Sequence, residues 1–409
     1  MDLDLVEQRN HEFGTSQLTD GDLERLFSAP DLFRLRKTRD GWDLRTKGVV
    51  GVLALDRVRL TIKPKFEIDG GMLLAWLSYA AAHSRTVKGR RTWAKGAVNL
   101  VDLIIAAYLE ECRALVRGQL RKDYVRQDDV DVVLRGRLDF ARQATQRFGM
   151  LDKLHVRTFD RRVDVWENEV CGAALVHAAR ITGNGGLRRD AGELAALFPS
   201  CSPMSARATL ARARHHRMNL RYLPAHSWAG LLLNSGGVAD LLSPGELGTD
   251  SLLLDMNRLW ETVVRRMVTA AAKSAGASVV PSTKELATRV GQPGHRSSTF
   301  HPDVLVRDSG LLAVDAKYKR YDQHAVSNSD VHQLLTYASS YGSGGVPRTV
   351  IVHPSGADTA TRRVSVRGPA GSLGVIDVVG LSVAESPEAN VLRLAGFLFD
   401  RQIAHGAQR

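Results

Sequence analysis

Residues 300–317 read Phe300-His301-Pro302-Asp303-Val304-Leu305-Val306-Arg307-Asp308-Ser309-Gly310-Leu311-Leu312-Ala313-Val314-Asp315-Ala316-Lys317. Two short apolar runs flank a polar turn, which is typical of a β-hairpin. Side chains alternate along a strand, so Asp315 and Lys317 are expected on one face, and an antiparallel return can bring Asp303 beside them. Carboxylate oxygens suit Mg²⁺, and an ammonium group suits an attacked phosphate. The stretch therefore predicts a metal-dependent hydrolytic site on one face of a sheet.

The spacing of these residues resembles a known nuclease signature. Pro302-Asp303 followed by Asp315-Ala316-Lys317 is similar to the PD-(D/E)xK motif, with Asp in place of the commoner Glu. Upstream, Glu261 lies in a long helical pattern and matches the helix-borne acid of that fold. Downstream, Gln333 and Tyr337 resemble the QxxxY element of RecB-like nucleases.

The residues that flank the motif make the resemblance more specific. Asp315-Ala316-Lys317-Tyr318-Lys319, with its surroundings, resembles the McrC family, the nuclease subunits of McrBC-type modification-dependent restriction systems. Ile62-Lys63-Pro64-Lys65 and Leu134-Arg135-Gly136-Arg137 are similar to phrases of the same family. The resemblance implies an α/β class, with a carboxyl-terminal restriction-endonuclease-like mixed sheet flanked by helices and an α+β region before it.

The resemblance, together with the chemistry of the side chains, implies roles in the site. Asp303 and Asp315 are expected to bind Mg²⁺, or Mn²⁺ in its place, with the backbone carbonyl of Ala316 as a further ligand. Lys317 is expected to orient the attacking water or to stabilise developing negative charge. Glu261 could hold a second cation or orient the ligands of the first.

Other residues are expected to support catalysis or to contact DNA. Gln333 and Tyr337 are four residues apart and therefore share a helix face, where Gln333 supports the site and Tyr337 contacts the DNA backbone. Lys319 is expected on the same strand face as Lys317, as a phosphate contact. Arg90 and Arg91 lie in a basic loop that could grip DNA, although a solvated loop or one facing a protein partner fits the same charge.

The sequence contains no G-x-x-x-x-G-K-[ST] motif, so it has no P-loop of this type. McrC-like nucleases are driven by a separate AAA+ GTPase hexamer, McrB, so the resemblance implies such a partner and double-stranded, modified DNA as the substrate. A function of another class remains open, which is a non-catalytic adaptor that only stimulates the AAA+ partner. Magnesium-dependent cleavage distinguishes the two.

Composition sets broad limits on function. Among 409 residues, Lys and Arg number 56 against 44 Asp and Glu, a formal net charge of +12. That excess suits a polyanionic partner, although an Arg-rich proteome explains it equally well. The cysteines Cys112, Cys171 and Cys201 lie far apart, which indicates neither a zinc site nor a disulfide framework and favours a reducing cytoplasm. The acidic start predicts no signal peptide, and no apolar run predicts a membrane span.

Pattern changes along the chain predict its organisation. We expect an α+β region over 1–242 that binds the motor partner, a Pro- and Gly-containing linker over 243–250 and the nuclease domain over 251–409. The amino-terminal region is predicted to be β-rich over 1–70, helical over 72–120, extended over 121–160 with a bulge or close approach at Gly136, and helical over 165–242. Its helices are expected at 165–182, 188–197, 204–219 and 226–233.

The nuclease domain is predicted in more detail. Helices are expected over 252–275, over 328–341 with Ser329 or Asn328 as the N-cap, and over 384–404. Strands are expected over 278–281, 285–290, 348–354, 362–368 and 374–379, besides the central hairpin.

Several polar residues are interpreted as structural. Lys63 and Lys65 are expected on a solvated strand face. Asp160 and Glu167 lack a strand-borne lysine partner, so we expect no second metal site there. His215 and His216 are adjacent in a predicted helix, where they would diverge by about 100° and could not easily share a metal.

Overall fold

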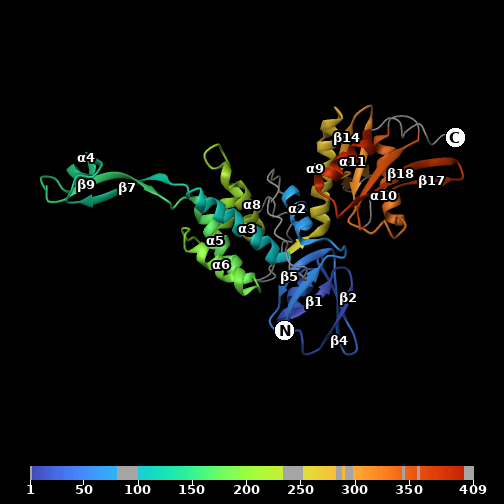
Figure 1. Ribbon diagram of the computed structural model, residues 1–409, viewed down its shortest axis with the longest axis horizontal. Coiled ribbons are helices and arrows are strands. Elements are labelled where there is room, and N and C mark those ends of the chain that lie inside the picture. The colour runs from blue at the N-terminus through green and yellow to red at the C-terminus, as the bar shows by residue number, and fades with distance from the viewer. Residues whose placement is uncertain are drawn as a thin grey trace. The chain divides into compact units, whose positions relative to one another are not determined.

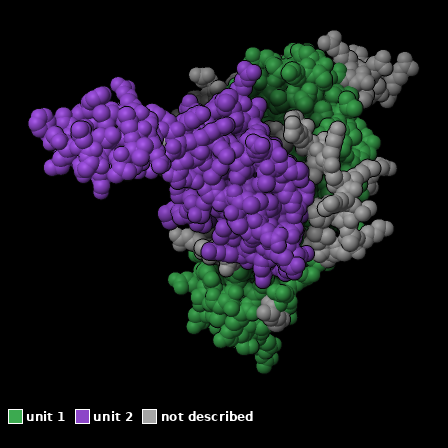
Figure 2. Space-filling model, turned by 60° about the vertical axis from the view of Figure 1, so that its left-hand side comes forward, with its two compact units in different colours: residues 1–103, 240–409 green, residues 104–239 purple. Residues whose placement is uncertain are grey.

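The computed structural model describes residues 2–80, 100–233, 252–281, 288–290, 298–342, 346–356 and 360–399. The chain forms two compact units (Figure 2), one made of residues 1–103 and 240–409 and the other of residues 104–239. This grouping differs from the predicted division, whose linker lies outside the described residues. In the described part of the chain, no helix has the length and apolar character that a bilayer crossing requires.

The first unit begins with a four-stranded sheet in the order β1-β6-β5-β10, built from β1 (Asp2–Val6), β5 (Val49–Ala54), β6 (Arg59–Lys63) and β10 (Leu252–Asp255). β1 runs parallel to β6, and β10 runs antiparallel to β5. Gly51 has a φ of +132°, and a Cβ there would lie 2.1 Å from the carbonyl oxygen of Leu252, so glycine is required for this pairing. The pairing joins residues near 50 to residues near 253, which explains why the compact unit is discontinuous in sequence.

The prediction of a helix beginning at Leu252 is wrong. Leu252–Leu254 are buried in β10, and the helix α9 begins at Met256. Asp255 is its N-cap, because the carboxylate accepts hydrogen bonds from the backbone amides of Asn257 and Arg258. Edge pairing with β5 therefore outweighs the helical pattern of the leucines.

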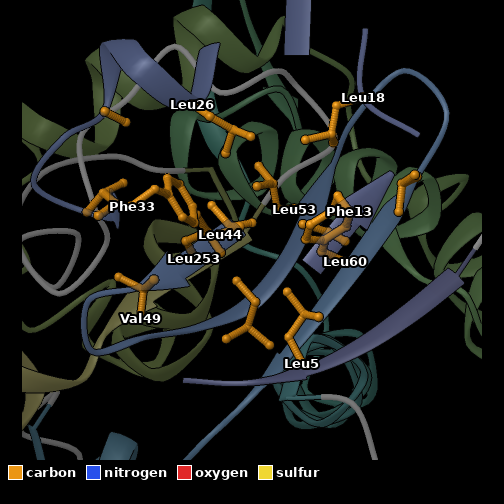
Figure 3. Packing of buried hydrophobic residues seen from close by; sticks show 14 residues of the cluster. Leu5, Phe13, Leu18, Leu26, Phe33, Leu44, Val49, Leu53, Leu60 and Leu253 are labelled. Carbon is orange, nitrogen blue, oxygen red and sulfur yellow. The ribbon is translucent and has the colours of Figure 1, made fainter. Parts of the chain in front are cut away.

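A second sheet packs against the first, in the order β2-β4-β3, with β2 (Asn10–Gly14), β3 (Phe33–Lys37) and β4 (Gly41–Thr46). The helix α1 (Asp20–Ser28) follows β2, and α2 (Gly70–Ala80) follows β6. Figure 3 shows the shared core, in which Phe13, Leu26, Leu44, Leu60 and Leu253 pack together. The β-rich prediction for residues 1–70 is confirmed.

The rest of this unit contains a six-stranded mixed sheet in the order β11-β14-β15-β16-β18-β17. Its strands are β11 (Ser278–Val280), β14 (Val304–Arg307), β15 (Leu311–Ala316), β16 (Arg348–Ser355), β17 (Thr361–Gly368) and β18 (Gly371–Ser382). β14 and β15 form the predicted antiparallel hairpin, whereas β15, β16 and β18 run parallel. A separate ribbon pairs β12 (Thr288–Val290) with β13 (Ser298–Phe300). The mixed sheet predicted for this region is confirmed.

The helices of this region are α9 (Met256–Ser274), α10 (Asn328–Tyr341) and α11 (Pro387–Phe399). Figure 1 shows α9, α10 and α11 around the strands of the sheet. The N-cap of α10 is Ser327, whose hydroxyl accepts from the amide of Asp330, so the predicted N-cap was one or two residues too late. α10 turns Leu334, Tyr337 and Tyr341 into the core formed with Leu305 and Ile351.

The second unit combines a helical body with an extended ribbon (Figure 1). The helices are α3 (Leu100–Arg117, which crosses the unit boundary), α5 (Trp166–Ile181), α6 (Gly185–Ala195), α7 (Pro203–Arg212), the short 3-10 helix η1 (Leu220–Tyr222) and α8 (Leu223–Leu233). The ribbon consists of β7 (Asp123–Asp131), β8 (Arg137–Leu138), α4 (Phe140–Gln146) and β9 (Leu154–Arg162). The sequence pattern did not predict α4.

Two predictions for this unit have clear outcomes. Gly136 has a φ of +78°, and a Cβ there would lie 2.4 Å from the carbonyl oxygen of Arg157, so the predicted close approach is confirmed. The helix expected over 204–219 ends at Arg212, so the placement of His215 and His216 on a helix is wrong. His215 instead lies with its Nε2 atom 2.8 Å from Nδ1 of His226.

Candidate active site

The strand register of the β14–β15 hairpin brings Asp303 and Asp315 to the same end of the hairpin. Val304, the first residue of β14, pairs with Val314 of β15. Asp303 directly precedes Val304 and Asp315 directly follows Val314, so the two acids lie at the same end of the paired strands. The backbone amide of Ala316 donates a hydrogen bond of 2.6 Å to Oδ2 of Asp303. The two acids of the predicted motif therefore meet because the hairpin forms.

Burial makes these two carboxylates costly as anions. Asp315 is 1% exposed. Burial, followed by the nearby charge of Asp315, raises the pKa of Asp303 to about 7. Burial also raises the pKa of Asp315, although the neighbouring Lys317 opposes that shift. Desolvation and mutual repulsion together describe a site that favours a bound cation.

Lys317 follows directly after β15, and its ammonium turns back towards Asp315. Nζ lies 2.8 Å from Oδ2 of Asp315 as an ion pair. That oxygen is buried, and apart from this ion pair it has no hydrogen-bond partner among the described residues. Burial lowers the pKa of Lys317, but the charges of Asp315 and Asp303 outweigh burial and raise it. The ammonium is therefore charged at neutral pH.

The helix α10 completes a chain of hydrogen bonds around the site. Lys317 Nζ donates to Oε1 of Gln333 at 3.0 Å, and Nε2 of Gln333 lies 3.1 Å from the Tyr337 hydroxyl. That hydroxyl donates to the backbone carbonyl of His301 at 2.7 Å. Tyr337 is 1% exposed, so these hydrogen bonds hold its side chain in the interior, and its contact with the DNA backbone stays a prediction.

Glu261 lies on α9 and makes a different set of contacts. Its Oε1 atom accepts a hydrogen bond of 3.0 Å from Nη2 of Arg265, one helical turn further along. Its charge contributes to the raised pKa values of Asp303 and Asp315. Within the described residues, no group of three or more His, Cys, Asp or Glu side chains lies close enough together to hold a metal ion, and the role of Glu261 at a cation stays a prediction.

Lys319 does not lie on the strand face predicted for it, because β15 ends at Ala316. Its Nζ atom pairs with Oδ2 of Asp330 at 2.5 Å, and the same carboxylate accepts from the hydroxyls of Tyr321 and Ser327. Sequence reasoning missed Asp330, although its place in the first turn of α10 is readable from the pattern. Arg90 and Arg91 lie outside the described residues.

The residues present fit a divalent cation. The buried carboxylate of Asp315 and the partly buried carboxylate of Asp303 lie on facing ends of the hairpin, and Oδ2 of Asp315 has no partner in the described structure besides the Lys317 ammonium. Hard oxygen ligands of this kind suit Mg²⁺ or Mn²⁺. The amide of Ala316 bonds to Asp303, which brings the backbone of Ala316 alongside the carboxylate. Its carbonyl as a ligand stays a prediction.

The interpretation of Lys65 as a solvated residue is wrong. Its Nζ atom donates to the backbone carbonyl of Tyr318 at 2.8 Å and to Oε1 of Gln8 at 3.0 Å. Lys63 fits the expected solvated face better, because its ammonium pairs with Asp4 and its side chain is 38% exposed. The strand β6 ends between these two lysines, which explains their different surroundings.

The acid Glu167 of the second unit has a structural environment. It is fully buried, pairs with Arg121 at 2.8 Å and accepts a hydrogen bond from Asn219 at 3.0 Å. These contacts tie the start of α5 to its neighbours. They agree with the interpretation of this acid as structural.

Comparisons with known proteins extend these observations. A family model described as "McrBC 5-methylcytosine restriction system component" matches residues 44–354. The chain is also similar to a structure of a refined half-complex from a tetradecameric assembly of Thermococcus gammatolerans McrB AAA+ hexamers with bound McrC, at 18% identity and a TM-score of 0.66, with 97% of this chain and 100% of that chain covered. A cryo-EM structure of the Thermococcus gammatolerans McrBC complex is similar at 19% identity and a TM-score of 0.48, over 66% of this chain and 88% of that chain. No curated protein matches.

Proposed function

Because this chain belongs to the McrBC restriction-system family, we propose that it is a Mg²⁺-dependent DNA endonuclease subunit that cleaves phosphodiester bonds when a AAA+ GTPase partner activates it. The observation that carries the proposal is the arrangement of Asp303, Asp315 and Lys317. One buried carboxylate, Asp315, and one partly buried carboxylate, Asp303, lie beside an ammonium that is 2.8 Å from Asp315. This combination suits phosphodiester hydrolysis better than it suits packing, because each buried charge costs stability.

The proposed chemistry assigns Asp303 and Asp315 to cation binding. A bound Mg²⁺ would lower the pKa of a coordinated water and neutralise charge on the phosphate. Asp303 is held for this task by the Ala316 amide before any cation binds. The raised pKa values of both acids agree with this role, since the cation replaces protons that the buried acids otherwise retain.

Lys317 has a separate role as an electrostatic stabiliser. Its ammonium is held between Asp315 and Gln333, so it is preorganised beside the position that a scissile phosphate would take next to the acids. A fixed positive charge in a partly buried site stabilises the developing negative charge of the transition state. Gln333 and Tyr337 keep the lysine in place through α10.

The partner is proposed from the resemblance and from the ribbon of the second unit. The related Thermococcus gammatolerans structure contains McrB AAA+ hexamers with bound McrC, and we extend this kind of partner, a AAA+ GTPase hexamer, to the present chain. The ribbon exposes several large apolar side chains, including Phe140 at 74%, Phe148 at 84% and Leu151 at 83%. Clustered exposed apolar residues mark interaction surfaces, so this ribbon is the proposed contact with the partner. Modified double-stranded DNA is the proposed substrate, and the cytoplasm is the proposed location.

Cleavage by the reconstituted system tests the proposal. The full chain is mixed with a AAA+ protein of the McrB kind, with GTP or ATP, and with plasmid DNA that carries 5-methylcytosine. Linear or nicked products that require Mg²⁺ and disappear with EDTA support the nuclease assignment. Stimulated nucleotide hydrolysis without any cleavage, with methylated and unmethylated plasmids alike, would instead support the non-catalytic adaptor.

A further inference from the structure

The parallel pairing of β1 with β6 places the ends of both strands at one edge of the amino-terminal sheet. Val6 pairs with Lys63, and the amide of Glu7 donates to the Lys63 carbonyl at 3.0 Å. Glu7 and Lys65 follow these strand ends, so two oppositely charged side chains leave the sheet at the same edge. Oε1 of Glu7 also accepts a hydrogen bond of 2.9 Å from the amide of Lys65.

Both charged residues contact Tyr318, the residue directly after Lys317. The Tyr318 hydroxyl donates to Oε1 of Glu7 at 2.7 Å. The Lys65 ammonium donates to the Tyr318 carbonyl at 2.8 Å and lies 4.2 Å from the centroid of its ring. Tyr318 is 4% exposed, and Phe66 packs against it with ring centroids 5.3 Å apart. The amino-terminal sheet therefore holds Tyr318 by its hydroxyl, its ring and its backbone.

Stability alone does not account for this arrangement. Glu7 is 1% exposed, and its Oε2 atom has no hydrogen-bond donor among the described residues. Burial raises the pKa of Glu7 and lowers the pKa of Lys65 to about 8, although each charge partly offsets the penalty of the other. A buried ion pair is commonly no more stable than well-packed apolar side chains, but its directional bonds fix geometry. The geometry fixed here is that of the residue next to the proposed catalytic lysine.

The backbone at Lys317 is held from two sides. Its amide donates to the carbonyl of Val352 at 3.0 Å, and the next residue is fixed by Glu7 and Lys65. We propose that Glu7 and Lys65 are positioning residues that act through Tyr318 to hold the Lys317 ammonium between Asp315 and Gln333. This inference rests on the proposed function. The inference gives the amino-terminal sheet a part in the nuclease centre, although that sheet is separated from Lys317 by more than half of the chain in sequence.

Lys63 provides a matched control. Lys63 is the last residue of β6, two residues before Lys65, and its ammonium pairs with Asp4 at 2.6 Å on an exposed face. Lys63→Met removes the same charge as Lys65→Met and leaves the contacts of Tyr318 in place. Glu7→Gln and Glu7→Leu form a second pair, because glutamine keeps an oxygen that can accept from the Tyr318 hydroxyl and leucine does not.

The experiment uses the full chain with its AAA+ partner and 5-methylcytosine plasmid under single-turnover conditions. We expect the cleavage rate constant to fall about 10–100-fold in Lys65→Met and Glu7→Leu, the range typical of residues that orient a catalytic group. Tyr318→Phe and Glu7→Gln should lose less, and Lys63→Met should cut at the wild-type rate. The Mg²⁺ concentration at half-maximal rate and the half-saturating DNA concentration should stay unchanged, because the proposed roles of Glu7 and Lys65 involve no contact with metal or DNA.

The readouts separate positioning from a loss of folding. The fraction of folded protein is measured by thermal unfolding, and rates are expressed per folded molecule. If Lys65→Met does not fold, Tyr318→Phe decides, because it removes only one hydroxyl. The inference would be overturned if the folded variants of Glu7, Lys65 and Tyr318 cleaved at the wild-type rate, or if Lys63→Met and Lys65→Met cleaved at the same rate. Either result would leave the nuclease assignment intact. A wild-type chain that does not cut with its partner would overturn the proposed function itself.

Discussion

The amide of Ala316 donates a 2.6 Å hydrogen bond to Oδ2 of Asp303 across the open end of the β14–β15 hairpin. This bond holds the carboxylate of one strand end against the backbone of the other. Because both ends carry an acid of the motif, the hairpin itself fixes the spacing of the oxygens that we propose bind the cation. A charge-neutral replacement of Asp303 can therefore keep the fold and remove only the anionic ligand.

Cation binding should stabilise the wild-type chain. The carboxylates of Asp303 and Asp315 repel each other, and a cation that binds only the folded state raises its stability by mass action. We expect Mn²⁺ or Mg²⁺ at 100 times its dissociation constant to add about 2.7 kcal/mol to the free energy of unfolding. Asp303→Asn and Asp315→Asn should lose this increment. A thermal midpoint that rises equally with Mg²⁺ in wild type and Asp303→Asn would contradict the assignment of the ligands.

Lys317 and Lys319 should differ in their effect on cleavage. Lys317 contacts Asp315 and Gln333, whereas Lys319 is paired with Asp330 outside this group. We expect Lys317→Ala to lose cleavage and to retain metal and DNA binding. Lys319→Ala, like Gln333→Ala, should have a milder effect. Plasmid cleavage and Mn²⁺ titration measure both properties, and a dead Lys319→Ala beside a normal Lys317→Ala would reverse the roles.

The hairpin and its two acids were predictable because they depend on local alternation and on one turn. Asp303 and Asp315 are brought together by strand register alone, and α10 follows from the spacing of Leu334, Tyr337 and Tyr341. The role of Leu252–Leu254 was not predictable in this way, because three leucines suit a helix as well as an edge strand. Long-range pairing with β5 decided between them.

Contacts between distant segments were also beyond the sequence pattern. Lys65 has the alternation of an exposed strand residue, yet it lies against Tyr318 once the sheets are assembled. Glu7 carries no local signal for burial. His215 was misplaced because the basic pattern continues after α7 ends at Arg212. In each case the partner that defines the environment lies outside the sequence window that predicts secondary structure.

The stability of the chain should depend on pH through Lys65. Burial lowers the pKa of Lys65 in the folded state to about 8, below the 10.5 of an exposed lysine. Between pH 8 and pH 10.5, Lys65 holds its proton in the unfolded chain more than in the folded chain. The contribution of Lys65 to the free energy of unfolding therefore rises with pH over this range. Because a tenfold change in proton affinity corresponds to about 1.36 kcal/mol, the free energy of unfolding should change by about 3 kcal/mol at most across this range.

Comparison with a variant isolates this effect from other titrating groups. The difference in unfolding free energy between wild type and Lys65→Met should therefore change between pH 8 and 10.5, in favour of wild type at the higher pH. Denaturant unfolding at several pH values provides the data, and a pH-independent difference for Lys65→Met would show that this lysine is not desolvated.

The exposed apolar residues of the ribbon should matter for the partner and not for folding. Phe148 is 84% exposed beside α4, so Phe148→Ser should reduce stimulation of the partner's nucleotide hydrolysis and leave the thermal midpoint unchanged. Leu392 on α11 is 76% exposed and provides a control at a similar exposure in the other unit. Equal losses of stimulation in Phe148→Ser and Leu392→Ser would argue against the ribbon as the contact.

Cleavage of 5-methylcytosine plasmid by the full chain and its AAA+ partner, with wild type compared with Asp303→Asn, tests the central claim most directly. Asparagine keeps an oxygen that can accept from the Ala316 amide, so the hairpin and the partner's nucleotide hydrolysis should be retained. We expect Mg²⁺-dependent products with wild type and a loss of more than about 100-fold with Asp303→Asn, beyond the range of an outer-shell change. Cleavage at the wild-type rate by folded Asp303→Asn would contradict the proposed nuclease centre.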